Sequence, residues 1–301
     1  MKRIFISLFL AIASTVVCNA QLLYKISHKD LVSPSYIVGS YHLAPASFID
    51  SIHGAKAAID AVEVVCGEVV MSEMESRENQ KRLQEAITLP DGKSLADIFT
   101  ADEMLRINNY MDNLLGMNLN SPMLKNQLGK MTPMALSTQL QLVQYMKLTP
   151  GFNPLKLIDA YFQEVAKQAG KKVAGLESVD FQIETLYKGA TLERQKQQLL
   201  CMIDNDEYYS LQMKELAAAY FAQDMQALLD VTEEKIGNQC DSTPGEEGAL
   251  IYGRNAAWVK AMPAMMGEAP TLFVVGAAHL PGEKGVLELL RAKGYTVEAV
   301  K

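Results

Sequence analysis

The sequence of 301 residues is rich in hydrophobic side chains (49%) and carries a formal net charge of −7. Its length is sufficient for one large domain with a sizeable core, and no low-complexity linker divides it into independent domains. The negative net charge disfavours nucleic acids and anionic membranes as main partners, because both bind proteins through basic surfaces.

The first 20 residues have the pattern of a secretory signal peptide. Two basic side chains at 2–3 precede an apolar run over 4–17 and a small-residue cleavage site that ends at Ala20. The apolar run is shorter than the roughly 20 residues that span a bilayer, and the residues before Cys18 lack the small side chain usual before a lipid-modified cysteine. We therefore expect a periplasmic or secreted protein that begins at Gln21, without a later transmembrane segment. Loss of the two basic residues would change the net charge from −7 to −9.

Strand patterns are found toward both ends of the chain. Short strands are predicted at 22–26, 35–38 and 62–66, with a helix over 49–60 before the third strand. A further strand is predicted at 172–176, and the last thirty residues follow the order strand, helix, strand. These segments predict a sheet to which both chain ends contribute.

The remaining segments, about 71–170 and 179–267, have helical patterns. Thr100 begins a capping box before a helix that ends at Gly116, and Thr132 precedes a helix with proline at its first position. Pro154 is predicted to open the helix that ends at Gly170. We therefore predict one α/β domain over 21–301, a mixed sheet built from both chain ends with a large helical insertion at about 71–170. Methionines in this insertion are interpreted as core rather than as a binding surface.

Three cysteines remain after cleavage of the signal peptide. Cys201 and Cys240 are candidates for a disulfide bridge between helices, whereas Cys66 lies in an apolar run and is interpreted as a buried free thiol. Their spacing includes no C-x-x-C pair, which argues against a cysteine metal site.

An internal repeat places two of the four histidines in the same position. The segment 36–43 (YIVGSYHL) matches 273–280 (FVVGAAHL), so that each strand pattern is followed by Gly-x-x-His, ending at His42 and His279. Glycine permits a sharp turn or close approach where the strand ends, and ligands of open α/β sheets bind at the carboxyl ends of the strands. Neutral imidazole is a ligand of zinc, manganese, cobalt and iron. The repeat therefore predicts a metal site at this edge of the sheet.

Other segments supply candidate polar groups for the same edge. Glu68 lies near the end of the third strand, whereas its competitor Glu63 lies inside that strand. Glu177 follows the fourth strand, and Arg254 begins a helical run before the second motif. A carboxylate completes many such metal shells or activates a bound water. The alternatives are that Glu177 caps a helix or faces solvent and that Arg254 makes a structural ion pair.

Taken together, these segments resemble the TraB/PrgY/GumN family over nearly the whole mature chain. The resemblance rests on the two Gly-x-x-His motifs, the strand leading to Glu68, the Gly-Leu-Glu segment ending at Glu177 with Gln182, and the pair Arg254-Asn255. The family includes the Tiki proteins, described as metal-dependent proteases that use paired Gly-x-x-His motifs and an acidic residue. The resemblance implies a fold similar to the erythromycin-esterase and ChaN-like group and dependence on manganese or cobalt.

The leading prediction is a metal-dependent hydrolase, a peptidase that acts outside the cytoplasm on a peptide or protein substrate. His42, His279 and Glu68 are the predicted ligands of manganese, cobalt or zinc, and Glu68, Glu177 and Arg254 are the predicted catalytic residues. No G-x-S-x-G or H-E-x-x-H motif offers a competing mechanism. The alternative is a non-enzymatic protein that binds haem or metal, as ChaN-like proteins bind haem, or that sequesters a peptide. An inactive scaffold that keeps the fold is a further alternative.

Overall fold

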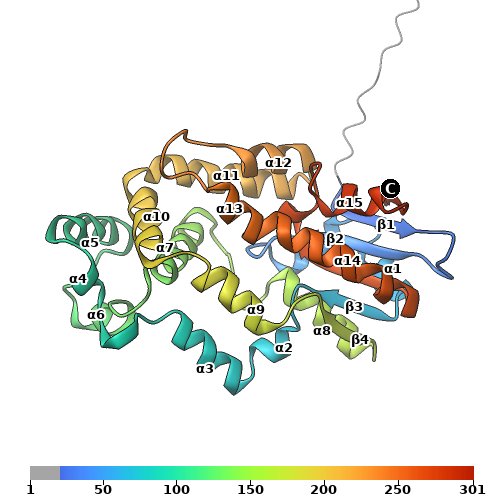
Figure 1. Cartoon of the computed structure of the whole chain (residues 1–301), viewed down its shortest axis with the longest axis horizontal. Helices are drawn as coiled ribbons and strands as arrows, with labels where there is room; N and C mark the ends of the chain where they lie inside the picture. The colour runs from blue at the N-terminus through green and yellow to red at the C-terminus, as the bar shows by residue number, and fades with distance from the viewer. Residues whose placement is uncertain (1–20) are drawn as a thin grey trace, which may run out of the picture.

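The computed structural model describes residues 21–301, and the predicted signal peptide lies outside them. A mixed sheet of six strands has the order β4-β3-β5-β2-β1-β6 and occupies one side of the molecule (Figure 1). The neighbours β4, β3, β5 and β2 are parallel, whereas β1 pairs antiparallel with β2 and β6. The strands are β1 Leu23–Ser27, β2 Ser35–Ser40, β3 Val64–Gly67, β4 Lys172–Gly175, β5 Thr271–Gly276 and β6 Thr296–Ala299. The prediction of an α/β fold with a sheet built from both chain ends is confirmed.

Helices fill the long connections between the strands. Those before β4 are η1 Ala46–Ser51, α1 Ala55–Ala61, α2 Met71–Met74, α3 Arg77–Ala86, η2 Pro90–Gly92, α4 Leu95–Ile98, α5 Ala101–Leu115, α6 Pro122–Leu128, α7 Pro133–Leu148 and α8 Ile158–Gln168. Those after β4 are α9 Val179–Ile183, η3 Glu184–Lys188, α10 Leu192–Asp204, α11 Asp206–Phe221, α12 Met225–Glu233, α13 Pro244–Glu247, η4 Gly248–Tyr252, α14 Gly253–Glu268, η5 Ala277–His279 and α15 Val286–Ala292. Within residues 21–301, no helix is both long and apolar enough to cross a membrane.

The main hydrophobic core joins the sheet to the helices that pack on it. Ile37, Phe273 and Val275 from the strands are buried in one cluster with Phe162 of α8 and Trp258 of α14. α8 packs against β3 and β4, and α14 crosses the sheet in the view of Figure 1. Because α8 and α14 are anchored in this core, polar residues in their first turns are held at fixed positions near the sheet.

A second core lies in the helical part of the molecule, away from the sheet (Figure 1). Ile107 and Met111 of α5, Leu136 of α7 and Leu199 of α10 are buried there. The helical part thus extends beyond the predicted insertion, because α10 packs against α7 and α5 from the later helical stretch. The core interpretation of the methionines holds for Met111, whereas the helical surface exposes Met117, Met123 and Met146.

Local predictions were right at most helix boundaries and wrong at two. Thr100 and Glu103 form the predicted capping box, and Gly116 ends α5 in a left-handed conformation. The single helix over 49–60 is wrong, because left-handed Gly54 (φ 76°) separates η1 from α1. Pro154 does not open α8. The side chain of Asn153 instead accepts a hydrogen bond from the Leu155 N–H, so this segment forms a turn and α8 begins at Ile158.

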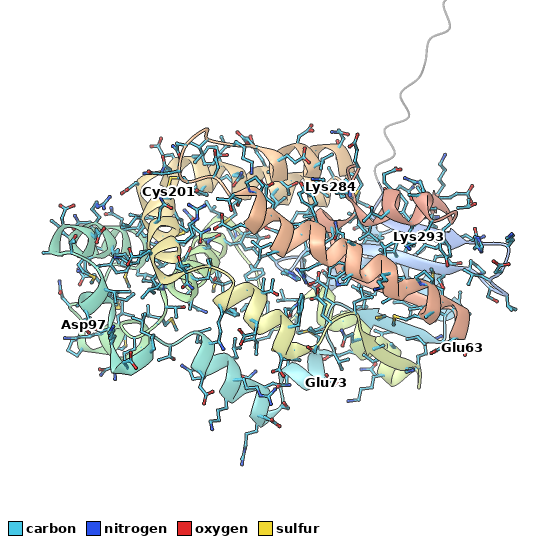
Figure 2. All side chains as sticks on the ribbon, viewed as in Figure 1. Glu63, Glu73, Asp97, Cys201, Lys284 and Lys293 are labelled. Atoms are coloured by element: carbon cyan, nitrogen blue, oxygen red, sulfur yellow. A yellow bond between two sulfur atoms is a disulfide. The ribbon has the colours of Figure 1, made fainter. Side chains whose placement is uncertain are left out.

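The predicted cysteine pairing is present. Cys201 of α10 forms a disulfide with Cys240, which lies in the loop between α12 and α13 rather than on a second helix. The disulfide lies in the helical part, far from the strands (Figure 2). Cys66 is a buried free thiol on β3, and burial raises its pKa to about 12. Cys66 is therefore in its thiol form at neutral pH, and we interpret it as a packing residue of the core.

Candidate functional site

Four predicted site residues, His42, Glu68, Glu177 and His279, follow the carboxyl ends of four parallel strands, whereas Arg254 lies in the first turn of α14. Ser40 of β2 pairs with Gly276 of β5, and Gly67 of β3 pairs with both Val274 of β5 and Gly175 of β4. The residues that follow these ends therefore emerge at one edge of the sheet, which includes both motif histidines, as predicted. Glu63 is excluded from this edge, since it precedes β3 and lies at the opposite end of the sheet (Figure 2).

Glycines of the two motifs bring the strand ends close together. A Cβ atom on Gly39 would lie 2.9 Å from Cβ of Ala277 and 3.0 Å from Cδ1 of Leu280. Gly39 of the first motif therefore makes room for the η5 turn of the second. A Cβ atom on Gly276 would lie 3.4 Å from both the Glu68 carboxylate and the His279 ring. The G-x-x-H pattern thus specifies the packing between the motifs as well as the positions of the histidines.

His279 is buried and held in one orientation. Its Nδ1 lies 2.6 Å from Oδ1 of Asn255, whose amide nitrogen donates to the Lys284 oxygen, so Nδ1 carries the proton and donates a hydrogen bond to Asn255, and Nε2 carries the lone pair. Arg254 donates to this Nε2 at 3.4 Å, and the Trp258 ring lies 4.5 Å from the imidazole. Burial, together with the positive charges of Arg254 and His42, lowers the pKa of His279 to about 4, although Glu68 opposes the shift. His279 is therefore a neutral imidazole near pH 7.

His42 has the same place in the repeat but a different environment. Its side chain is 70% exposed, and its Nδ1 lies 3.3 Å from Oδ2 of Asp159, a partly buried residue in the first turn of α8. Ser40 donates a hydrogen bond of 2.5 Å to the other Asp159 oxygen and so fixes the carboxylate. The charge of Asp159 raises the pKa of His42, and solvent screens this exposed pair in part.

Glu68 is fixed by donors from three segments. Its Oε1 accepts the Gly276 N–H at 2.8 Å, and its Oε2 accepts hydrogen bonds from Arg254 at 2.6 Å and Gln182 at 3.2 Å. Burial opposes ionisation of Glu68, but the charges of Arg254 and His42 with the Gly276 hydrogen bond lower its pKa overall. Glu68 is consequently a carboxylate between the two motifs.

Arg254 links Glu68 to Glu177 in a buried ion-pair network. The guanidinium donates from Nε and Nη2 to both Glu177 oxygens, at 2.8 and 2.9 Å, and from Nη1 to the backbone oxygen of Leu250. Trp258 also donates to Glu177, at 2.9 Å. The side chains of Arg254, Glu68 and Glu177 are 6%, 10% and 5% exposed. Arg254 therefore makes the buried ion pair that was the alternative prediction for it. The same pair fixes the position of Glu68, one of the predicted site residues.

The ligand atoms of His42, His279 and Glu68 are of the kinds that bind a divalent metal, but the three side chains are not arranged as a complete coordination shell. Each motif histidine uses Nδ1 for an oxygen partner, so Nε2 is the atom that would bind a metal, as is usual for metal-binding histidines. In His279 this Nε2 faces Arg254 at 3.4 Å. Two imidazoles with a carboxylate match the ligands of zinc, manganese and cobalt. Among residues 21–301, however, no three His, Cys, Asp or Glu side chains are placed to hold an ion as they stand. His42, His279 and Glu68 as metal ligands stay predictions.

Two contributors to the site were not anticipated. Asp159 was missed because it lies 119 residues from Ser40, in a helical segment whose pattern signals only an amphipathic helix. Gln163, one turn further along α8, donates to the Val69 oxygen and accepts from the Met71 N–H, which fixes the loop that carries Glu68. A polar residue at the start of a helix that packs on the sheet was the only signal for Asp159.

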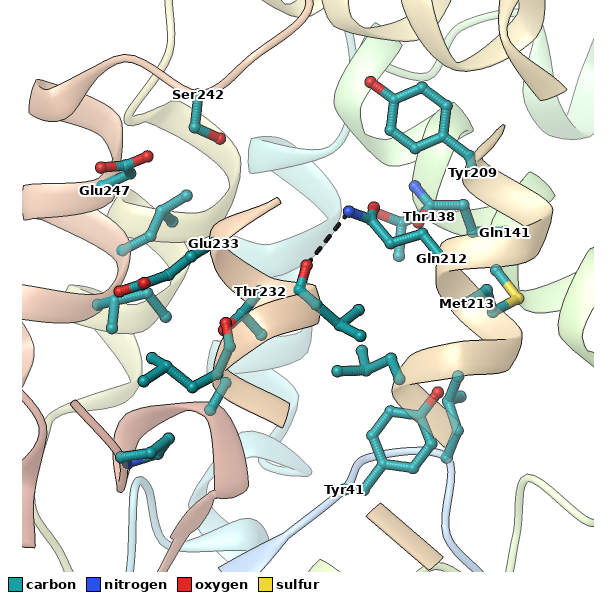
Figure 3. A pocket seen from close by; sticks show the side chains of 18 of the residues that line it. Tyr41, Thr138, Gln141, Tyr209, Gln212, Met213, Thr232, Glu233, Ser242 and Glu247 are labelled. Atoms are coloured by element: carbon teal, nitrogen blue, oxygen red, sulfur yellow. Dashed lines mark hydrogen bonds between the residues drawn. The ribbon is translucent and has the colours of Figure 1, made fainter. Parts of the chain in front are cut away.

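A large cavity opens beside this edge of the sheet, between the sheet and the helical part. It has a volume of about 1030 Å³, and its lining includes Tyr41 and Ala278, the neighbours of the two motif histidines. Asn255, the partner of His279, also lines it. Figure 3 shows Tyr41 on one side of this space and polar side chains of α7 and α11 further along the wall. The strand-end site, formed by His42, His279 and Glu68, is therefore next to a space large enough for an organic ligand.

Comparison with known proteins gives one match. A model of the TraB/PrgY/gumN family matches residues 22–299. No curated protein and no solved structure matches the chain. The match covers all six strands and both motifs.

Proposed function

The chain belongs to the TraB/PrgY/gumN family, and we propose that it is a metal-dependent hydrolase of peptide bonds with His42 and His279 as metal ligands. The observation that carries this proposal is the convergence of both Gly-x-x-His motifs and the Glu68 carboxylate at one sheet edge. A manganese, cobalt or zinc ion held there would supply the nucleophile by lowering the pKa of a bound water towards neutrality.

The protein's own groups would prepare this site in three ways. Asn255 fixes the Nδ1–H tautomer of His279, so that Nε2 is the atom available as a ligand. Asp159 does the same for His42, because its carboxylate faces Nδ1. Glu68 stays ionised and is placed either to complete the metal shell or to take a proton from the attacking water.

Arg254 and Glu177 would act through Glu68 rather than on the substrate. The hydrogen bonds of Arg254 go to Glu68, Glu177, Leu250 and His279. This use of its donors favours a positioning role over direct stabilisation of an oxyanion. Glu177, buried beneath Arg254 and Trp258, balances the charge of the guanidinium.

A place outside the cytoplasm is part of the proposal. The Cys201–Cys240 disulfide supports it, since stable disulfides form in oxidising compartments. The signal-like first 20 residues of the sequence point the same way.

The decisive experiment combines metal analysis with a peptide-cleavage assay. The purified protein should contain manganese, cobalt or zinc, lose cleavage of a peptide library on chelation, and recover it with added manganese or cobalt. His42→Ala and His279→Ala should each lower bound metal and cleavage together. His53→Ala is the matched control, because His53 lies exposed in a turn before α1.

Two results would overturn the proposal. One is a folded His42→Ala, His279→Ala double variant that cleaves peptides at an undiminished rate. The other is a Soret band in the optical spectrum with bound iron and no cleavage, which would favour the haem-binding alternative. Circular dichroism of each variant establishes that it is folded.

A further inference from the structure

The large cavity is bounded by both histidine motifs and by the helical part. Tyr41 and Leu43 flank His42, whereas Ala278 and Pro281 flank His279, and all four line the cavity. Most of the remaining wall comes from α7, α11, α12 and η4, with further contributions from the segment 152–157 after α7 and the segment 235–247 after α12. A molecule in the cavity would therefore contact sequence neighbours of both candidate metal ligands, and one end of it would lie beside the strand-end site.

The walls of this cavity are mostly apolar. They include Leu142, Phe152, Met213, Leu216, Leu229 and Ile251, which come from five separate segments of the chain. Methionine adapts its shape to different apolar partners. Burial of large apolar side chains is favourable in proportion to the apolar area removed from water, so a ligand with several such groups would gain most of its affinity here.

Polar groups are spaced along the same walls. Thr138, Gln141, Tyr209 and Gln212 are visible on the α7 and α11 side of the cavity (Figure 3). Gln212 donates to the Val231 backbone oxygen at 3.4 Å, which links α11 to the opposite wall. The amide nitrogens of Gln141 and Gln212 already donate within the protein, to Ser137 and to Val231. Their side-chain oxygens can accept hydrogen bonds from the N–H groups of a peptide backbone, whereas a hydrocarbon chain has no donor to offer them.

The wall next to Arg254 is itself irregular. Residues Gly248–Tyr252 form a single π-helical turn, and Leu250, Ile251 and Tyr252 of this turn face the cavity. π-Helical turns occur frequently at functional sites. Because Arg254 donates to the Leu250 oxygen, this wall is coupled directly to the Arg254–Glu68 ion pair.

We propose that the cavity binds a hydrophobic segment of the peptide substrate, with two or more bulky aliphatic or aromatic side chains next to the scissile bond. This inference rests on the proposed function, because it places the scissile bond at the histidine motifs. It identifies the substrate class as hydrophobic peptides. Acyl lipids, whose chains carry no donor for the amide oxygens of Gln141 and Gln212, are the competing class.

Binding should be measured in a protein that cannot turn over the peptide. We would use fluorescence anisotropy with the His42→Ala, His279→Ala double variant and a labelled eight-residue peptide that alternates Leu or Phe with Ser. An analogue with Asn and Gln in place of Leu and Phe should bind at least tenfold more weakly. Adding Met213→Glu should weaken binding of the apolar peptide at least tenfold.

Leu211→Glu is the matched control, since Leu211 lies on the same helix, is 54% exposed and does not line the cavity. Thr138→Trp, which fills the cavity from an exposed position on α7, is the second variant if Met213→Glu does not fold. Equal binding of the two peptides, no binding of either, or no effect of both cavity variants would overturn the inference. So would tight binding of oleate that the apolar peptide does not displace.

The binding result is separable from the proposed function. If the apolar peptide binds as expected and wild-type protein with added manganese or cobalt does not cleave it, the hydrolase proposal fails and the cavity assignment stands. If wild-type protein cleaves apolar and polar peptides equally well, the hydrolase proposal stands and the substrate class is wrong.

Discussion

Replacing Arg254 by methionine would test the buried ion-pair network directly. Methionine preserves much of the apolar stem of Arg254 and its packing on Trp258, but it removes the cation that contacts both Glu68 and Glu177. Both carboxylates are at most 10% exposed, so each would be left as an uncompensated buried charge. Breaking a buried pair in this way costs about 3–5 kcal/mol, and we expect a loss of this size in the free energy of unfolding at pH 7.

The loss should depend on pH with a defined sign. In the wild type the pKa of Glu68 is lowered by folding, so its contribution to stability is present at neutral pH and disappears as the pH falls through about 4 and below. In Arg254→Met, the burial of Glu68 is no longer opposed by this cation, so its pKa should rise above the unfolded value. The variant is then relatively favoured in acid, and the difference from wild type should shrink from pH 7 to pH 4.

Urea unfolding at pH 7 and pH 4, followed by circular dichroism, measures both effects. Arg82→Met is the matched control, because Arg82 forms exposed ion pairs with Glu78 and Asp180 and its loss should leave unfolding nearly unchanged. An Arg254→Met variant as stable as wild type at pH 7 would refute the reasoning. A loss that is the same at both pH values would show that packing, rather than the charge on Glu68, is responsible.

The remaining predictions concern the motif packing, the disulfide and the processed terminus. Gly39→Ala should lower the free energy of unfolding by about 1–3 kcal/mol, because it forces the motifs apart, and it should reduce cleavage. Gly267→Ala meets no atom within 4 Å and should stabilise α14 by up to about 1 kcal/mol. Urea titration measures both changes in stability. Cys201→Ser should destabilise the protein by about 2–4 kcal/mol, because the bridge to Cys240 joins residues 39 apart, and dithiothreitol should lower the melting temperature of wild type alone. Intact mass of protein from its native envelope fraction should place the N-terminus at Gln21, and an uncleaved or lipid-modified chain would contradict this.

The sequence repeat was sufficient to place the candidate site at one edge of the sheet, because the same strand-Gly-x-x-His pattern occurs twice. Two identical strand-Gly-x-x-His patterns in parallel strands must end at the same edge of the sheet, and β2 and β5 proved to be direct neighbours. Glu68, Glu177 and Gln182 follow adjacent parallel strands, so their meeting with Arg254 was also foreseeable in outline. These predictions needed only strand direction and the position of strand ends.

The partners of the histidines needed tertiary information. Asp159 approaches His42 because α8 packs on β3 and β4, which is a consequence of the buried face of α8 and not of any spacing near residue 159. The cavity is a similar case, because its walls join the two histidine motifs to α7, to the α11–α12 pair and to η4, which lie far apart in the sequence. A single sequence shows which face of each helix is apolar, but it does not show which helices enclose an empty space.

The repeat also concealed a difference between the two histidines. The identical motif position gives His279 an amide partner and a buried site beside an arginine, and the burial and the arginine keep it neutral. His42 instead has an exposed site and the Asp159 carboxylate, which favours its protonated form. A cation entering the site would therefore meet one imidazole already free of its proton and one that must release a proton first. Metal binding should then release protons near neutral pH from the His42 side of the site, and Asp159→Asn should reduce the number released. If the number of protons released on manganese binding is the same in wild type and Asp159→Asn, the two histidines are equivalent in protonation and this asymmetry has no part in metal uptake.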